Sequence, residues 1–129
     1  MSHFTTVQTK IKCLVTLQKV IEEMGYAFKE GVTQVRGYRG DLTEAIAVID
    51  TKSSYDIGVV QTADGYALVG DWEMLQVRAG IEQDEFMQTL NKKYAHAKVL
   101  DELKKQGYSV VEETENEQQV VTVRVRRWT

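Results

Sequence analysis

The run Asp56-Ile57-Gly58-Val59-Val60-Gln61-Thr62-Ala63-Asp64-Gly65-Tyr66-Ala67-Leu68-Val69-Gly70 lies near the middle of the chain and predicts its central structural element. Two short apolar runs flank Asp64-Gly65, a dipeptide that is typical of two-residue β-hairpin turns. We therefore expect residues 56–61 and 66–70 to form two antiparallel strands joined at this turn.

Other short stretches rich in apolar and β-branched residues predict strands on both sides of this hairpin. These stretches are residues 3–9, 26–29, 45–49, 108–111 and 121–126. The acidic stretch Glu112–Glu117, between the last two of them, predicts a turn.

Two long amphipathic helices are predicted, one from about Thr9 to Met24 and one from about Gln83 to Gln106. Apolar residues recur every three or four positions in each, which places them on one face. In the first helix these residues are Leu14, Leu17, Ile21 and Met24. Thr9 is the expected N-cap, and Gly25 and Gly107 are expected to end the two helices. Residues 71–80 predict a loop or a short helix.

The predicted elements indicate one α+β domain over residues 1–129, with a mostly antiparallel sheet and two amphipathic helices. Met24-Gly25-Tyr26 and Gln106-Gly107-Tyr108 each close a helix and open a strand. This similarity suggests two β-α-β-β halves joined by the central hairpin. Helices often end in glycine before a strand, however, so a duplication is left open.

Composition and charge narrow the class of protein. The chain has 129 residues, of which 43% are hydrophobic and 27% charged, with a net charge of -3. These values are ordinary for a soluble globular domain and give no general attraction for nucleic acid. Cys13 is the single cysteine, and no apolar run is long enough to span a membrane. We therefore expect a cytoplasmic or stromal protein.

The sequence provides little support for catalysis. His3, His96 and Cys13 lie too far apart to show a zinc-ligand spacing, so no metal or other cofactor is expected. No nucleophile elbow or phosphate-binding glycine loop is present. Whether the protein is an enzyme is uncertain, and the sequence favours a non-enzymatic role.

Gln34–Asp41 is the first candidate site, because it holds two glycines, two arginines and a tyrosine between predicted elements. The glycines would permit a bend, and the arginines could bind a carboxylate or phosphate. The predicted anion-binding residues are Arg36, Tyr38, Arg39, His3 and Tyr55. The same stretch could instead be a turn whose arginines lie over the sheet.

A second set of residues suggests contact with another macromolecule. It consists of Trp72, Arg124, Arg126 and Trp128. Tryptophan is enriched at interface hot spots, although Trp72 could equally fill the core. The basic C-terminal strand could bind RNA, but an edge strand kept soluble by its charges is the more ordinary interpretation.

Several short motifs occur in an order that resembles a known family. They are Met1-Ser2-His3-Phe4, Val35-Arg36-Gly37-Tyr38, Tyr55-Asp56-Ile57-Gly58, Lys93-Tyr94-Ala95, Gln106-Gly107-Tyr108 and Arg127-Trp128. Together they resemble the hypothetical chloroplast reading frame thirty-five family, a domain-of-unknown-function family of plastids and cyanobacteria. The resemblance implies a small soluble protein of cyanobacterial or plastid type and brings no reaction with it.

The first functional hypothesis is therefore a non-enzymatic accessory or protein-interaction factor. The alternative is a binder, or an enzyme, that takes a small anion at the Arg36-Gly37-Tyr38-Arg39 loop. Another protein is the expected partner and a small anion the alternative ligand, while nucleic acid is not expected. A homodimer remains open, because a symmetric contact could form at the basic edge strand.

Overall fold

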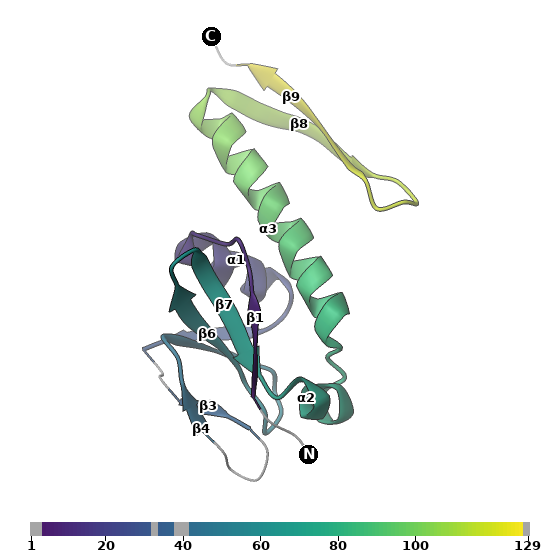
Figure 1. The fold of residues 1–129 in the computed structure, drawn as a ribbon. Helices are drawn as coiled ribbons and strands as arrows, with labels where there is room; N and C mark the ends of the chain where they lie inside the picture. The colour runs from purple at the N-terminus through teal and green to yellow at the C-terminus, as the bar shows by residue number, and fades with distance from the viewer. Residues whose placement is uncertain (1–3, 32–33, 38–41, 128–129) are drawn as a thin grey trace. The chain divides into compact units, whose positions relative to one another are not determined.

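Figure 1 shows the fold of the chain in a computed structural model that describes residues 4–31, 34–37 and 42–127. This part of the chain contains 3 helices and 9 strands, and every paired strand is antiparallel. The α+β class predicted from the sequence is confirmed. The chain divides into two compact units, Met1–Tyr94 and Ala95–Thr129, called unit 1 and unit 2 below.

The largest sheet of unit 1 has five strands in the order β1-β7-β6-β5-β2. The strands are β1 (Thr5–Gln8), β2 (Ala27–Glu30), β5 (Ala47–Asp50), β6 (Ile57–Thr62) and β7 (Gly65–Gly70). The central hairpin is confirmed as β6 and β7, but Thr62 pairs with Gly65, so its turn is Ala63-Asp64. Gly65 has a φ of 141° and lies against the carbonyl oxygen of Ile11, where a Cβ would not fit.

Two shorter strands, β3 (Gln34–Arg36) and β4 (Leu42–Glu44), form a separate two-stranded sheet. Val35 of β3 is fully buried and belongs to a cluster with Ala45, Val48 and Val69. These contacts attach β3 to the core of unit 1, and they fix the position of the neighbouring Arg36.

Helix α1 (Leu14–Glu23) begins five residues later than predicted, with Cys13 as its N-cap. Thr9 is not the cap, because its hydroxyl donates to the carbonyl of Tyr66 at 2.5 Å and accepts from the N–H of Ile11. The Tyr94 hydroxyl instead accepts hydrogen bonds from two backbone N–H groups at the start of the helix, at 3.1 and 3.3 Å. Gly25, with a φ of 95°, follows the helix as expected.

The inner face of α1 carries Leu17, Val20 and Ile21, all buried, whereas Leu14 and Met24 at the ends of the predicted stripe are half-buried. Residues 71–80, left open as a loop or short helix, form α2 (Trp72–Ala79). The Asp71 carboxylate caps this helix by accepting from the N–H of Met74 at 3.3 Å.

The long helix α3 (Gln83–Lys105) has the predicted limits and is followed by the hairpin of β8 (Tyr108–Glu115) and β9 (Val121–Arg127). The turn predicted over Glu112–Glu117 is wrong, since Glu112 to Glu115 belong to β8 and pair with β9. The pairing does not give two β-α-β-β halves either. Five strands of unit 1 share one sheet, while β8 and β9 pair only with each other within the described residues.

Candidate functional site

The predicted anion-binding arginine Arg36 is paired with a carboxylate of the chain. Its Nε lies 2.9 Å from Oδ2 of Asp56, and its Nη2 lies 2.8 Å from Oδ1, a two-pronged geometry. The backbone N–H of Arg36 donates to the same Oδ2 at 3.0 Å, and Nη2 also donates to the carbonyl of Ser53. The hydrogen bond to Asp56 raises the pKa of the Arg36 guanidinium, which therefore stays charged.

This ion pair is asymmetric in its exposure to solvent. The Asp56 side chain is only 5% exposed, whereas the Arg36 side chain is 49% exposed. The carboxylate therefore depends on Arg36 for compensation of its charge, while the guanidinium can also be hydrated. Arg36 thus has a structural role that uses its Nε and Nη2 donors.

The neighbouring loop orients Asp56 through a small hydroxyl network. Thr51 is buried, and its hydroxyl donates to the carbonyl of Tyr55 at 2.5 Å. The hydroxyl of Ser53 accepts from the N–H of Tyr55 at 3.1 Å. The predicted site residue Tyr55 thus belongs to this hydroxyl network through its backbone N–H and carbonyl. His3, Tyr38 and Arg39 lie outside the described residues.

Gly37 is needed for space rather than for its backbone angles. Its φ is not in the left-handed region, but a Cβ at this position would collide with the ring of Phe4. The glycine of the predicted bend therefore allows Phe4 to pack over the end of β3.

Trp72, predicted as a contact residue or a core filler, belongs to the core. It is 6% exposed, and its indole N–H donates to the carbonyl of Thr5 at 3.1 Å. Its ring lies 6.1 Å from that of Phe86. Trp72 thus joins β1, α2 and α3 and is not available at the surface.

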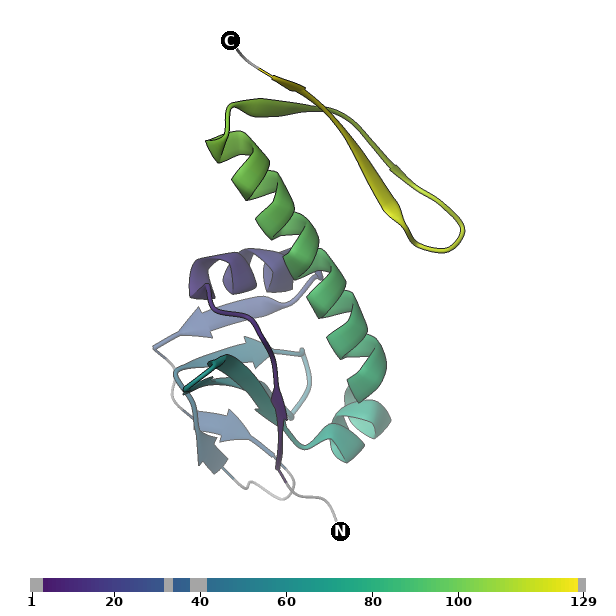
Figure 2. The ribbon, with the colours of Figure 1, turned by 45° about the horizontal axis from the view of Figure 1, so that its top comes forward.

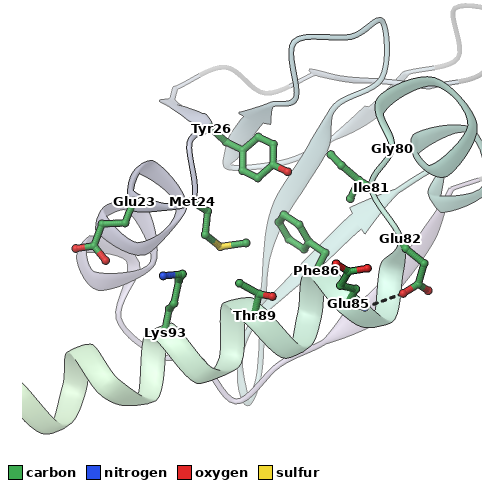
Figure 3. A pocket seen from close by; sticks show the side chains of 10 residues that line it. All are labelled: Glu23, Met24, Tyr26, Gly80, Ile81, Glu82, Glu85, Phe86, Thr89 and Lys93. Atoms are coloured by element: carbon green, nitrogen blue, oxygen red, sulfur yellow. Dashed lines mark hydrogen bonds between the residues drawn. The ribbon is translucent and has the colours of Figure 1, made fainter. Parts of the chain in front are cut away.

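Unit 1 also contains a hollow of about 360 Å³ that the sequence did not predict (Figure 3). It lies where the end of α1, the start of β2 and the first turns of α3 meet. Its lining residues are Glu23, Met24, Tyr26, Gly80, Ile81, Glu82, Glu85, Phe86, Thr89 and Lys93. Burial raises the pKa of the Tyr26 hydroxyl, so this phenol remains neutral near pH 7.

The charges of this hollow favour cationic over anionic groups, since three carboxylates line it with one ammonium. The first N–H groups of α3, which could otherwise attract an anion, are already used. The Glu82 carboxylate accepts from the N–H of Asp84 at 3.1 Å and from that of Glu85 at 2.8 Å. The adjacency of Met24 and Tyr26 around Gly25 was visible in the sequence, but their contact with α3 was not.

Unit 2 has a different character, because none of its described residues, 95–127, is buried. Figure 2 shows β8 and β9 side by side, joined by a loop at the far end of the hairpin. Several valines of this unit are largely exposed: Val99 by 52%, Val110 by 43%, Val111 by 51% and Val120 by 54%. Apolar side chains of unit 2 are therefore accessible to solvent on α3, on β8 and beside β9.

The alternation along β9 separates its side chains onto two faces of the hairpin. Val121, Val123 and Val125 point to one face and are half-buried, while Arg124 and Arg126 point to the other and are exposed. The sequence predicted this alternation, and we keep the two arginines as predicted contact residues. Trp128 lies outside the described residues.

Polar contacts connect the elements of unit 2 to one another. His96 of α3 lies 3.0 Å from the Glu113 carboxylate, and Arg124 lies 3.6 Å from that of Glu112. The guanidinium of Arg127 stands over the ring of Tyr108 at 5.7 Å from its centroid. These contacts are solvent-exposed and stabilise the hairpin only weakly.

The described residues, 4–31, 34–37 and 42–127, have neither a cluster of metal-ligating side chains nor a membrane-spanning helix. They contain no group of three or more histidine, cysteine, aspartate or glutamate side chains arranged to hold a metal ion. No helix among them is both long and apolar enough to cross a membrane.

Comparison with known proteins gives consistent matches over most of the chain. A family model described as "Protein of unknown function (DUF1257)" matches residues 20–124. A protein named "Uncharacterized protein ycf35" from Guillardia theta is 30% identical over 128 residues, covering 99% of this chain and 98% of the relative. Relatives with the same name from Cyanophora paradoxa and Pyropia yezoensis are 28% and 25% identical with the same coverage. No solved structure shows significant similarity.

Proposed function

The chain belongs to the DUF1257 family, and we propose that it acts as a non-enzymatic accessory factor that binds another protein through unit 2. The observation that carries this proposal is the absence of any buried residue among residues 95–127. A unit of this size gains too little from its own apolar contacts to be stable, because small domains bury a low fraction of their surface.

The chemistry of unit 2 supports a protein partner rather than a small ligand. Its exposed groups are spread along a helix and two strands and do not converge on a cavity. Its exposed valines and arginines offer apolar and charged groups to a partner, and arginine is enriched in protein interfaces. A cytoplasmic or stromal location, expected from the single cysteine and the family resemblance, belongs to the same proposal.

A capture experiment with matched variants tests this function. Full-length chain would be immobilised and exposed to extract of a cell that expresses it, with Val123→Glu as the disrupted surface. Val15→Glu is the control, since Val15 is 78% exposed on α1 of unit 1. We expect the same captured protein with wild type and the control, and its loss with Val123→Glu. Equal capture by all three proteins would refute the proposal.

The second candidate function is binding of a small anion at the Arg36-Gly37-Tyr38-Arg39 loop. Its support is that Arg36 is half-exposed and that its Nη1 takes no part in the contacts with Asp56 and Ser53. A thermal-shift titration with phosphate and citrate tests it. Binding at 100 times the dissociation constant would stabilise the fold by about 2.7 kcal/mol. A shift that survives Arg36→Ala together with Arg39→Ala would exclude this loop as the site.

A further inference from the structure

We propose that the partner of unit 2 is a second copy of this chain, which pairs its β9 antiparallel with β9 of the first copy. In this arrangement a two-fold axis passes Val123, and the two hairpins form one four-stranded sheet. The inference rests on the proposed function, because it names the partner of the same surface.

The first argument is the open edge of β9. Within the described residues β9 pairs only with β8, so its other edge has no strand beside it. A two-stranded hairpin alone is marginally stable in water, whereas three or more strands with an apolar face are stable. Addition of a strand to such an edge is a common mode of protein recognition. A second β9 would therefore supply what the hairpin lacks.

The second argument is that the valine pattern of β9 is self-complementary. With Val123 opposite Val123 of the second copy, Val121 lies opposite Val125, and Val125 lies opposite Val121. All six valines then share one face, because their side chains alternate with the same period in both strands. The other face receives Thr122 opposite Arg124, which brings no two like charges into direct opposition.

The third argument is the distribution of charge along the hairpin. Glu115 and Glu117 lie at its loop end and Arg126 and Arg127 at its other end, while Glu112 lies directly opposite Arg124 between them. An antiparallel two-fold arrangement places the basic end of each hairpin beside the acidic loop end of the other. Each copy therefore gains the same favourable contact, as a closed two-fold interface requires.

The edge of β8 is a poorer candidate for the same contact. A bulge at Val111 interrupts its register with β9, and bulges twist an edge away from further pairing. Two β8 strands would also bring their glutamates together. The structure thus distinguishes the two edges of the hairpin and favours β9.

Sedimentation velocity of the purified full-length chain is the first test. We expect a dimer whose population falls on dilution, and a monomer for Val123→Glu, since two carboxylates would then oppose each other at the axis. The control Val15→Glu should sediment as wild type does. A wild-type chain that remains monomeric at 100 μM would overturn the proposal.

Cysteine cross-linking tests the register of the two β9 strands, and its outcome does not depend only on the affinity between the two copies. Directly opposed residues of antiparallel strands have Cα atoms about 4.5–5.5 Å apart, within disulfide range. In a Cys13→Ser background, Val123→Cys should form a disulfide-linked dimer on mild oxidation. Val121→Cys alone should not, because its two copies would lie about 13 Å apart, at roughly 3.3 Å per residue. An equimolar mixture of Val121→Cys and Val125→Cys should cross-link.

Equal cross-linking by all three single variants would overturn the β9 register. A monomer in sedimentation together with a Val123-dependent capture from extract would overturn the second copy as partner and leave the proposed function standing. A dimer that shows neither register-specific cross-linking nor sensitivity to Val123→Glu would overturn both the surface and the partner.

Discussion

Removal of Arg36 should destabilise the protein more than removal of its partner Asp56. The Asp56 carboxylate is 95% inaccessible to water and accepts three hydrogen bonds from Arg36. Arg36→Ala leaves it only the one from the backbone N–H of residue 36. An uncompensated buried charge costs about 3–5 kcal/mol, and the remaining hydrogen bond places this variant near the lower limit. We expect a loss of about 3 kcal/mol in the free energy of unfolding.

Asp56→Ala should be milder, because the Arg36 side chain is 49% exposed and water can hydrate its guanidinium. The remaining cost is one backbone N–H without its acceptor and the loss of two partly screened hydrogen bonds, about 1–2 kcal/mol. The double variant should be more stable than Arg36→Ala alone, because it no longer contains the buried charge.

Equilibrium unfolding in urea, followed by far-ultraviolet circular dichroism, measures all three variants. Lys29→Ala is the control, since its ion pair with Asp50 at 3.1 Å is itself half-exposed and should contribute less than about 1 kcal/mol. An Asp56→Ala variant as unstable as Arg36→Ala, or a double variant with the summed loss, would refute the reasoning from unequal burial.

Three further predictions concern unit 1. Gly58→Ala should cost about 1–3 kcal/mol in urea unfolding, because its Cβ would lie 2.8 Å from Cγ1 of Val69 in the core; an unchanged midpoint would contradict this. Tyr94→Phe removes the hydroxyl that accepts two N–H groups at the start of α1, so hydrogen exchange there should accelerate, with a loss of about 1 kcal/mol. The pKa of the Asp50 carboxyl is lowered, first by the hydrogen bond from the backbone N–H of Lys52. The ionised carboxylate therefore stabilises the fold above the unfolded pKa of roughly 3.9, and this stabilisation is lost as the pH falls through the folded pKa. Asp50→Asn should therefore lower the urea midpoint more at pH 7 than at pH 2, and equal differences at both values would contradict this.

The sequence predicts best those elements whose determinants are local. The β6–β7 hairpin follows from two apolar runs around a turn, and α3 follows from its apolar spacing and the glycine after it. The start of α1 was missed because the hydroxyl of Thr9 is held by Tyr66, 57 positions away. No local pattern reports such a contact, so the sequence alone favours Thr9 as the cap.

The wrong turn in unit 2 and the unpredicted partner of Arg36 have the same origin. Glutamates have a low preference for strands, which is why the sequence predicts a turn. In the structure Glu112 and Glu113 belong to β8 because they pair with Arg124 and Val123 of β9. The sequence predicts Arg36 as a site residue, but its partner Asp56 lies 20 positions away and cannot be identified from spacing. The residue type of Arg36 indicates a charged contact, and only the tertiary structure shows that its partner is Asp56.

The pairing of β1 with β7 has a consequence for how the protein is made. The ribosome releases residues in chain order, so β1 emerges long before β7, its partner in the sheet. The hydroxyl of Tyr94, which secures the start of α1, emerges later still. The β6–β7 hairpin can close as soon as it leaves the ribosome, because its contacts are local. The strand β1 and the start of α1 are therefore synthesised before the residues that fix them in place, and until then they depend on the chain that follows them.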